Sequence, residues 1–505
     1  MKKKRWSLVR TAMMLLLCLM VLAGCSSNPA NTPDAAATQK ATDAPTAAAT
    51  EAPTDVPKIS LKDDDSFTLQ DIPEELMPTD KKIVVWMWGD NEEYQKYYDG
   101  FLADYPEYEL DFKVAATSDH VQLTEAVISG VGVPDAVLVA PRPADAYYTG
   151  LYQPLDFYLD NDPNYKREDI NPMALAGNTF AGKTYFACED LELCALGWNK
   201  TLFAEAGLDP EKPPRTFSEF EAACKALTKY NSSGEATQIG YKGTIGYWAL
   251  SSAMGRYVTG SDGFTVEFDT KEIRDSLEFS KSVPTFYNNK LAYADDEEYW
   301  NPTSGHAGLF YVNCKHISDY ITEDLDIGIA PWPVADDYTG EQNICVYSSQ
   351  QYGIPAAAKN PNGGWLFIRW MVTKGIGEVY NEEQFAANPN GYIPQYQSNA
   401  KLREAVNEKF MPMVSNPRII DLWEQRDAMY DKATMFLWSD VIESKFHPSI
   451  WASESKIYDG LVTITDQCAK IQKLGEKLHK EWIEQKLADG WTWTDDQTAL
   501  VPPAD

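Results

Sequence analysis

The sequence has none of the common motifs of catalytic or metal sites. It contains no Gly-x-Ser-x-Gly elbow, no His-Glu-x-x-His pair and no glycine-rich phosphate loop. Its five histidines form no arrangement typical of a nucleophile, and its cysteines form no Cys-x-x-Cys pair. An acidic run, Asp295–Glu298, precedes Trp300. Adjacent acids point to different faces, however, whereas a glycosidase places two acids across one bond. We therefore expect no enzymatic activity, no metal and no cofactor.

Basic residues are also scarce, with 44 Lys and Arg against 75 Asp and Glu. Five of the basic residues lie within the first ten positions, and removing them changes the formal net charge from −31 to −36. So acidic a chain argues against nucleic acid or an anionic membrane surface as a partner, and it favours neutral or cationic ligands. The 28 Tyr and 15 Trp are many, and flat aromatic faces suit sugar rings, although some of them belong to a core.

One apolar run stands near the N-terminus. Met13–Leu22 follows the basic residues and is too short to cross a membrane stably. It leads into Leu22-Ala23-Gly24-Cys25-Ser26, which resembles a bacterial lipobox. We predict that residues 1–24 are a signal peptide and that Cys25 carries lipid, which anchors an extracytoplasmic protein to the bacterial cell membrane.

Residues 25–78 are rich in Ala, Thr, Pro and Asp and have almost no aromatic residues. Such a segment buries too little apolar surface to offset its chain entropy, so we predict a disordered tether. The remaining body of about 425 residues is long enough for two or three domains.

The centre of the chain carries an ordered series of short motifs. They are Gly182–Tyr185, Trp198–Lys200, Ala206–Leu208, Pro213–Phe217 and Ala226–Thr228. This series resembles the signature of the family 1 extracellular solute-binding proteins, the sugar-capturing subunits of bacterial ABC importers. Trp198 replaces the usual Tyr and Phe217 the usual Trp. The resemblance covers residues 81–373 well and the remainder loosely.

The resemblance implies an α/β, two-lobed, periplasmic-binding-protein-like fold with a hinge and an interlobe ligand cleft. We expect lobe 1 in residues 79–187 and 346–386, and lobe 2 in residues 188–345. Residues 387–505 are expected to form a mainly helical C-terminal part of lobe 2 and a tail, and Trp491-Thr492-Trp493 has no interpretation.

Local patterns predict several elements. Apolar runs predict strands at 83–88, 109–114 and 136–139, with helices from Asn91 and over 120–129. Gly207 is placed to end a helix, and Thr216 with Glu219 forms a capping box that opens the next one. Cys188 and Cys194 either form a bridge or stay free and buried.

Candidate ligand contacts come from two arguments. Ligands of open α/β sheets bind outside the carboxyl ends of strands, which selects Trp88, Asp90 and Asn91. Arg142 follows another strand, and Glu189 and Asp190 lie where a hinge strand is expected to meet the cleft; all three fit a solvated loop equally well. The resemblance implies a stacking role for Trp248, weaker roles for Trp300, Trp332 and Tyr352, and a place for Asn313 at the end of a cleft strand. The family often has a stacking Trp just after that strand, where this chain has Cys314-Lys315-His316.

Together these features predict a monomeric, lipid-anchored binding protein. Its expected ligand is a carbohydrate, in particular an oligosaccharide, which lobe closure traps and which ABC permease subunits then receive. The alternatives are a receptor of the same fold for a non-sugar solute, or one that senses without transport.

Overall fold

The computed structural model describes residues 72–88, 91–115, 120–139, 142–188, 191–260, 264–287, 290–294, 296–322, 324–348, 351–380, 385–435 and 442–503. All of them belong to one compact unit, residues 57–505. The predicted signal peptide, Cys25 and most of the predicted tether lie outside the described residues. Among the described helices, none combines the length and the apolar character needed to cross a membrane.

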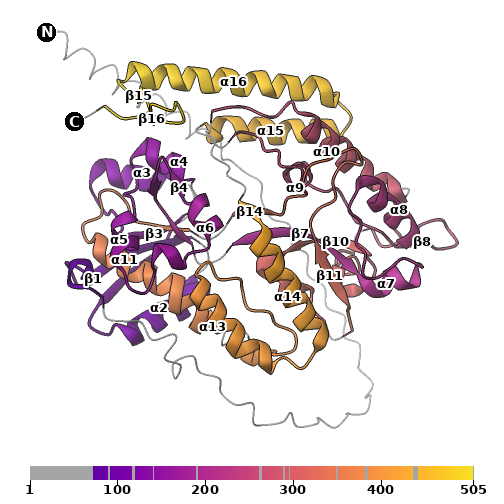
Figure 1. The fold of residues 1–505 in the computed structure, drawn as a ribbon, viewed down its shortest axis with the longest axis horizontal. Helices are drawn as coiled ribbons and strands as arrows, with labels where there is room; N and C mark the ends of the chain where they lie inside the picture. The colour runs from indigo at the N-terminus through magenta and orange to yellow at the C-terminus, as the bar shows by residue number, and fades with distance from the viewer. Residues whose placement is uncertain are drawn as a thin grey trace, which may run out of the picture. The chain divides into compact units, whose positions relative to one another are not determined.

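Lobe 1 is built on a five-stranded sheet with the order β2-β1-β3-β13-β6. Its strands β1 and β3 are labelled in Figure 1. Its strands are β1 (Lys82–Trp88), β2 (Glu109–Ala115), β3 (Ala136–Val139), β6 (Ala187–Cys188) and β13 (Gln351–Gly353). β1 is parallel to β2 and β3, whereas β13 runs antiparallel to β3 and β6. The helices and turns are η3 (Glu74–Leu76), α2 (Asn91–Asp104), α3 (His120–Ser129), α4 (Pro143–Thr149), α5 (Asp156–Asn161), η4 (Arg167–Asp169), α6 (Pro172–Gly177), α11 (Pro361–Trp370) and η8 (Met371–Tyr380), with the hairpin β4 (Thr179–Phe180) and β5 (Lys183–Thr184). The predicted strands and helices of this part are confirmed.

Helix α11 packs against β1 and β3 at very close range. A Cβ atom on Gly364 would lie 1.9 Å from the carbonyl oxygen of Asp135, so only glycine permits this approach. Asn360 caps the helix by accepting a hydrogen bond from Gly363 N at 3.2 Å. Trp365 and Trp370 are almost fully buried, so this helix belongs to the scaffold.

A buried ion pair ties α11 to the end of α5. Arg369 Nε lies 3.3 Å from Asp162 Oδ2, and neither side chain is exposed. Trp365 Nε1 donates a 2.7 Å hydrogen bond to the same carboxylate oxygen. Because a buried charge without its partner is costly, the two residues depend on each other.

Lobe 2 is built on a second sheet, with the order β10-β7-β12-β14 and with β11 also paired to β7. Its strands are β7 (Glu192–Asn199), β10 (Leu309–Asn313), β11 (Ile327–Ala330), β12 (Cys345–Ser348) and β14 (Thr434–Met435). The surrounding elements are α7 (Lys200–Glu205), α8 (Phe217–Leu227), β8 (Lys229–Tyr230), β9 (Ala236–Gln238), α9 (Tyr247–Ala253), α10 (Lys271–Ser282), η5 (Val283–Tyr287), η6 (Pro302–Ser304) and η7 (Cys314–Tyr320).

The predicted helix signals around α7 and α8 are confirmed. Gly207 follows α7 with φ of +76°, the left-handed conformation that glycine adopts without strain. Thr216 and Glu219 form both hydrogen bonds of the capping box. The apolar face of α8, which includes Phe220 and Leu227, is buried against the sheet of lobe 2.

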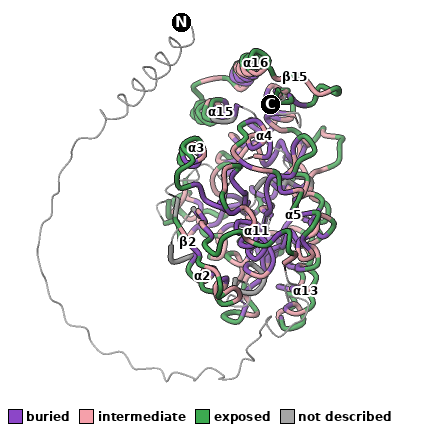
Figure 2. The backbone as a smooth tube through the Cα atoms, turned by 90° about the vertical axis from the view of Figure 1, so that its left-hand side faces the viewer, coloured by how far each residue is buried: buried purple, intermediate pink, exposed green. Residues whose placement is uncertain are grey.

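The C-terminal part is mainly helical. Its elements are α13 (Ala400–Phe410), η9 (Met411–Met413), α14 (Pro417–Lys432), α15 (Glu443–Tyr458), α16 (Ile464–Ala488), β15 (Thr492–Trp493) and β16 (Leu500–Val501). α14 packs against β11, and α15 and α16 pack against each other and against α10. Figure 2 shows the outer faces of α15 and α16 as largely exposed.

Cys188 and Cys194 are both free and buried, so they form no bridge. Asn178 Nδ2 donates to Cys188 Sγ at 3.5 Å, and Cys194 Sγ lies 2.7 Å from the hydroxyl of Tyr311. Burial raises the pKa of the Cys314 thiol to about 12, so that thiol stays protonated at neutral pH.

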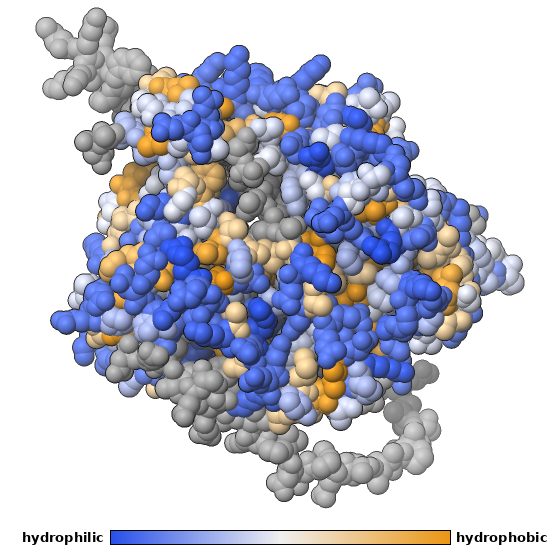
Figure 3. All heavy atoms as spheres, in the orientation of Figure 1, coloured by the Kyte–Doolittle hydropathy of each residue, from blue (hydrophilic) through white to orange (hydrophobic). Residues whose placement is uncertain are grey.

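The face drawn in Figure 3 is largely hydrophilic, with hydrophobic side chains in small separate groups. This agrees with the acidic composition of the chain.

Candidate functional site

The carboxyl ends of β1 and β3 lie side by side in lobe 1. The two strands pair in parallel at Val85–Ala136 and Trp86–Val137. β1 ends at Trp88, α2 begins at Asn91, and Arg142 is the extended residue that precedes α4. The fold therefore places three predicted contacts, Trp88, Asn91 and Arg142, at one edge of the sheet, where α/β proteins bind ligands. Asp90 lies outside the described residues.

Two chain crossovers form the hinge and run beside each other. One joins β6 to β7, and the other joins β12 to β13. They pair with each other at both ends, through Cys188–Gln351 in lobe 1 and Glu192–Ser348 in lobe 2. Glu189 and Asp190 belong to the first crossover and lie outside the described residues.

A third crossover, residues 392–399, and the neighbouring helix α14 are hydrogen-bonded to this hinge. Ser398 Oγ donates to the carbonyl oxygen of Cys188, and the hydroxyl of Tyr430 donates to that of Leu191. The rings of Tyr396 and Tyr430 stack with centroids 3.9 Å apart. These contacts connect α14 to the strand that links the lobes.

In lobe 2, a polar pair marks the hinge end of the sheet. Asn313 ends β10, and its Nδ2 donates a 2.8 Å hydrogen bond to Glu192 Oε1 at the start of β7. Asn313 Oδ1 accepts from Lys315 N at 3.0 Å and so caps η7. Asn313 was predicted, whereas Glu192 was missed. In the sequence, Glu192 could have been noticed as the single acid in the otherwise apolar run Leu191–Trp198.

The predicted aromatic contacts differ in exposure. Trp248 lies on α9 and is half-buried between two hydrophobic clusters. Trp300, Trp332 and Tyr352 are 3%, 2% and 0% exposed, so in this structure they act in packing. Trp300 Nε1 donates to the carbonyl oxygen of Tyr293 at 2.8 Å, and Tyr352 contacts Phe367 edge-on.

A cavity of about 430 Å³ lies beside β10 and η7 in lobe 2. Its walls combine aromatic rings with polar and charged groups; the lining includes Tyr241, Lys242, Trp300, Tyr311, Asp319 and Tyr320. Burial raises the pKa of Tyr320, so its hydroxyl stays protonated at neutral pH and keeps its capacity to donate a hydrogen bond. Apart from Trp300, this set was missed, because its members come from four separate segments.

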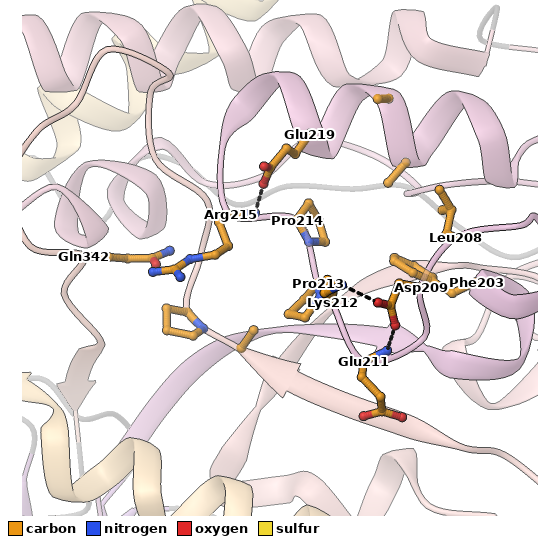
Figure 4. A pocket seen from close by; sticks show the side chains of 14 residues that line it. Phe203, Leu208, Asp209, Glu211, Lys212, Pro213, Pro214, Arg215, Glu219 and Gln342 are labelled. Atoms are coloured by element: carbon orange, nitrogen blue, oxygen red, sulfur yellow. Dashed lines mark hydrogen bonds and ion pairs between the residues drawn. The ribbon is translucent and has the colours of Figure 1, made fainter.

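A larger cavity, of about 830 Å³, lies between the α7–α8 connection and β11 (Figure 4). Phe203 and Leu208 contribute apolar surface, and the side chain of Arg215 points toward Gln342 in Figure 4. Several of its polar groups already have protein partners. Asp209 pairs with Lys212 at 2.7 Å, and Gln342 Nε2 donates to the carbonyl oxygen of Trp332 at 2.6 Å.

Comparison with known proteins places this architecture in a family. Residues 88–378 match the model of the bacterial extracellular solute-binding proteins, which is more than half of the chain. The chain belongs to this family.

Solved structures of other solute-binding proteins share its fold. An ABC substrate-binding protein from Listeria monocytogenes in complex with cycloalternan is 15% identical, with a TM-score of 0.57 over 79% of this chain and 98% of that one. The acarbose-binding receptor of Streptomyces glaucescens is 17% identical, with a TM-score of 0.57 over 79% and 98%. A maltodextrin-binding domain from Bdellovibrio bacteriovorus, bound to maltotriose, is 17% identical, with a TM-score of 0.57 over 79% and 100%. A comparison with curated proteins found no match.

In this solute-binding protein, Asn313 and Glu192 of lobe 2 lie beside the crossover that joins β6 to β7. The family match ends before α13, so the C-terminal helices and the β15–β16 hairpin lie beyond it.

Proposed function

We propose that this solute-binding protein captures a carbohydrate between its lobes and delivers it to an ABC permease. The observation that carries the proposal is the polar pair Asn313–Glu192 at the hinge end of lobe 2, in a chain of this family. The structural neighbours named above are described with cycloalternan, acarbose and maltotriose. Three neighbours with oligosaccharide-type ligands support an oligosaccharide here as well.

The chemistry of the pair suits a neutral polyol. A carboxylate accepts hydrogen bonds from hydroxyl groups, and Glu192 keeps acceptor capacity beyond the bond from Asn313. That bond also holds the carboxylate in one orientation before a ligand arrives, which lowers the entropy cost of binding. Trp88 and Trp248 are the proposed stacking partners, and Arg142 the proposed donor from lobe 1. Rotation about the hinge closes these groups on the ligand.

The membrane connection is part of the proposal. Lipid at Cys25 and the tether of residues 25–78 hold the protein at the outer face of the cell membrane, within reach of a permease. A separate ATPase provides the energy for transport. The chain itself binds and releases its ligand without changing it chemically.

A thermal unfolding screen of the chain from residue 26 onward tests the ligand class. A ligand at 100 times its dissociation constant stabilises the folded state by about 2.7 kcal/mol. We expect stabilisation by one class of oligosaccharide, with no change in the sugar after prolonged incubation. Stabilisation by amino acids, peptides or amines but by no sugar contradicts the carbohydrate assignment and leaves the family unaffected.

The anchor needs its own experiment. Cells that express the full chain and take up labelled palmitate should label this protein in the membrane fraction. Cys25→Ser should abolish the label and release the protein from that fraction. Equal labelling of both proteins argues against lipid at Cys25.

A further inference from the structure

The C-terminal end of the chain contacts both lobes. The first part of α16 is fixed to lobe 2, where Cys468 and Ile471 share a hydrophobic cluster with Ile273 of α10. The side-chain amide of Gln472 reinforces this attachment. Its oxygen accepts from Phe268 N at 2.9 Å, and its nitrogen donates to the carbonyl oxygen of Val266 at 2.8 Å.

The following segment, Trp482–Val501, lies against α4 and β4 of lobe 1; we call it the C-terminal strap. Figures 1 and 2 both show α16 ending near α4, with the β15–β16 hairpin beside it. The hydroxyl of Tyr148 on α4 accepts a 3.1 Å hydrogen bond from Leu500 N. The carbonyl oxygen of the same tyrosine accepts a 3.0 Å hydrogen bond from Lys486 Nζ.

Aromatic rings surround this contact. Tyr148 lies 4.8 Å from Trp482, 5.6 Å from Trp491 and 5.4 Å from Phe180 of β4, measured between ring centroids. Phe264, which belongs to the loop before α10 of lobe 2, lies 5.7 Å from Trp482 and 6.2 Å from Tyr148. Rings from lobe 1, lobe 2 and the strap therefore form one cluster.

Lys486 sits inside this cluster. Its Nζ lies 4.2 Å from the ring centroid of Trp491, 5.3 Å from that of Trp482 and 5.8 Å from that of Tyr148. These are distances of cation–π contact. Burial lowers its pKa, although the nearby Asp489 carboxylate partly opposes this. A partly buried lysine held by three rings and a carbonyl oxygen is a specific connection rather than a solvated surface charge.

Helix α4 transmits the attachment to the sheet of lobe 1. Ala146 is buried in a cluster with Val137 of β3 and with Tyr152. The lobes are thus connected twice, once through the hinge crossovers and once through α16 and the strap. Movement of α4 away from lobe 2 has to separate Lys486 and Leu500 from Tyr148.

We propose that the C-terminal strap limits how far the two lobes open. It acts as a second connection that holds lobe 1 against α16, and it lies outside the segment shared with the family. The proposal does not rest on the identity of the ligand.

The test is the distance between the lobes in ligand-free protein, measured by pulsed electron spin resonance. Spin labels are attached at Glu125→Cys on α3 and Ser232→Cys between β8 and β9, both exposed positions. The chain from residue 25 onward carries Cys25→Ser and Cys345→Ser, and its other five cysteines are buried. We expect Trp491→Ala and Lys486→Met to shift the distribution toward longer distances.

Two matched variants control for the loss of a side chain of the same kind. Trp451→Ala removes an exposed tryptophan from α15, and Lys480→Met removes an exposed lysine from α16. Both should leave the distances unchanged. Lys486→Met keeps most of the side-chain volume, so it decides the question if Trp491→Ala unfolds. Distances equal to or shorter than those of the controls overturn the proposal.

Discussion

Asn313 and Glu192 extend the pairing of two strands beyond its last backbone pair. β10 and β7 pair in antiparallel register up to Asn313–Cys194, and Glu192 lies two residues further toward the hinge. The 2.8 Å hydrogen bond from Asn313 Nδ2 to Glu192 Oε1 bridges that gap. It therefore sets the position of a carboxylate at the end of lobe 2 where the crossover begins.

A negative charge introduced at position 313 tests the role of this pair in ligand binding. Asn313→Asp keeps an acceptor for Lys315 N but places a second carboxylate against Glu192. We expect the loss of the bond and the repulsion to weaken ligand binding about tenfold, which corresponds to about 1.4 kcal/mol. Isothermal titration calorimetry with the ligand found in the unfolding screen measures the change.

The double variant Glu192→Gln, Asn313→Asp is the control, because it restores one donor and one acceptor with the roles exchanged. It should regain part of the lost affinity. If the double variant shows no rescue, and the changes in binding free energy of the two substitutions simply add, the two side chains act independently.

The ion pair between Asp162 and Arg369 predicts a large loss of stability on its removal. Asp162→Asn keeps an acceptor for Trp365 but removes the negative charge that lies 3.3 Å from the fully buried Arg369. We expect a loss of about 3–5 kcal/mol in the free energy of unfolding, measured by urea denaturation. Asp209→Asn is the matched control, because its partner Lys212 is exposed and solvent screens such a pair, so its loss should change the stability little. Similar losses in both variants contradict this prediction.

The raised pKa of Glu454 predicts that the free energy of unfolding depends on pH. Burial raises its pKa above the ordinary 4.5, and the hydrogen bond donated by the Tyr458 hydroxyl at 2.8 Å opposes this only in part. The folded state therefore holds the proton more tightly than the unfolded state. This contribution is fully present below pH 4.5 and is lost as the pH rises through the raised pKa.

Measurement of Glu454→Gln against the original chain isolates this group from other titrations. The original chain should lose stability relative to the variant between pH 4.5 and neutral pH. Chemical denaturation at a series of pH values gives the difference. A difference that stays constant, or that changes in the opposite direction, contradicts the assignment of Glu454 as a destabilised carboxylate.

Gly364→Ala tests the close approach of α11 to β3. The added methyl group would lie 1.9 Å from a backbone oxygen, which no side-chain rotation relieves. We expect a loss of at least about 1–3 kcal/mol, the usual cost of overpacking, despite the better helix propensity of alanine. Thermal unfolding detects the change, and a variant as stable as the original chain shows that α11 moves outward at little cost.

Much of the scaffold was predictable, because its signals are local. The cap at Thr216, the turn at Gly207 and the apolar strands each depend on residues a few positions apart. The ligand contacts were harder to predict. Tyr352 and Trp332 are aromatic like a stacking residue, but only the fold shows that they are buried.

The missed features depend on contacts between distant segments. The orientation of the Glu192 carboxylate depends on a hydrogen bond from Asn313, which lies 121 positions away in the sequence. The aromatic tail around Trp491 had no interpretation, because its partner Tyr148 precedes it by several hundred residues.

The attachment of the C-terminal strap has a consequence for folding during synthesis. A chain is synthesised from its N-terminus, and Tyr148 and Leu500 are 352 positions apart. Helix α4 and strand β4 therefore leave the ribosome long before the strap that covers Tyr148 and Phe180. During that interval these aromatic rings stay open to water and to other nascent chains, so the surface of the first lobe is completed by the last residues to be synthesised.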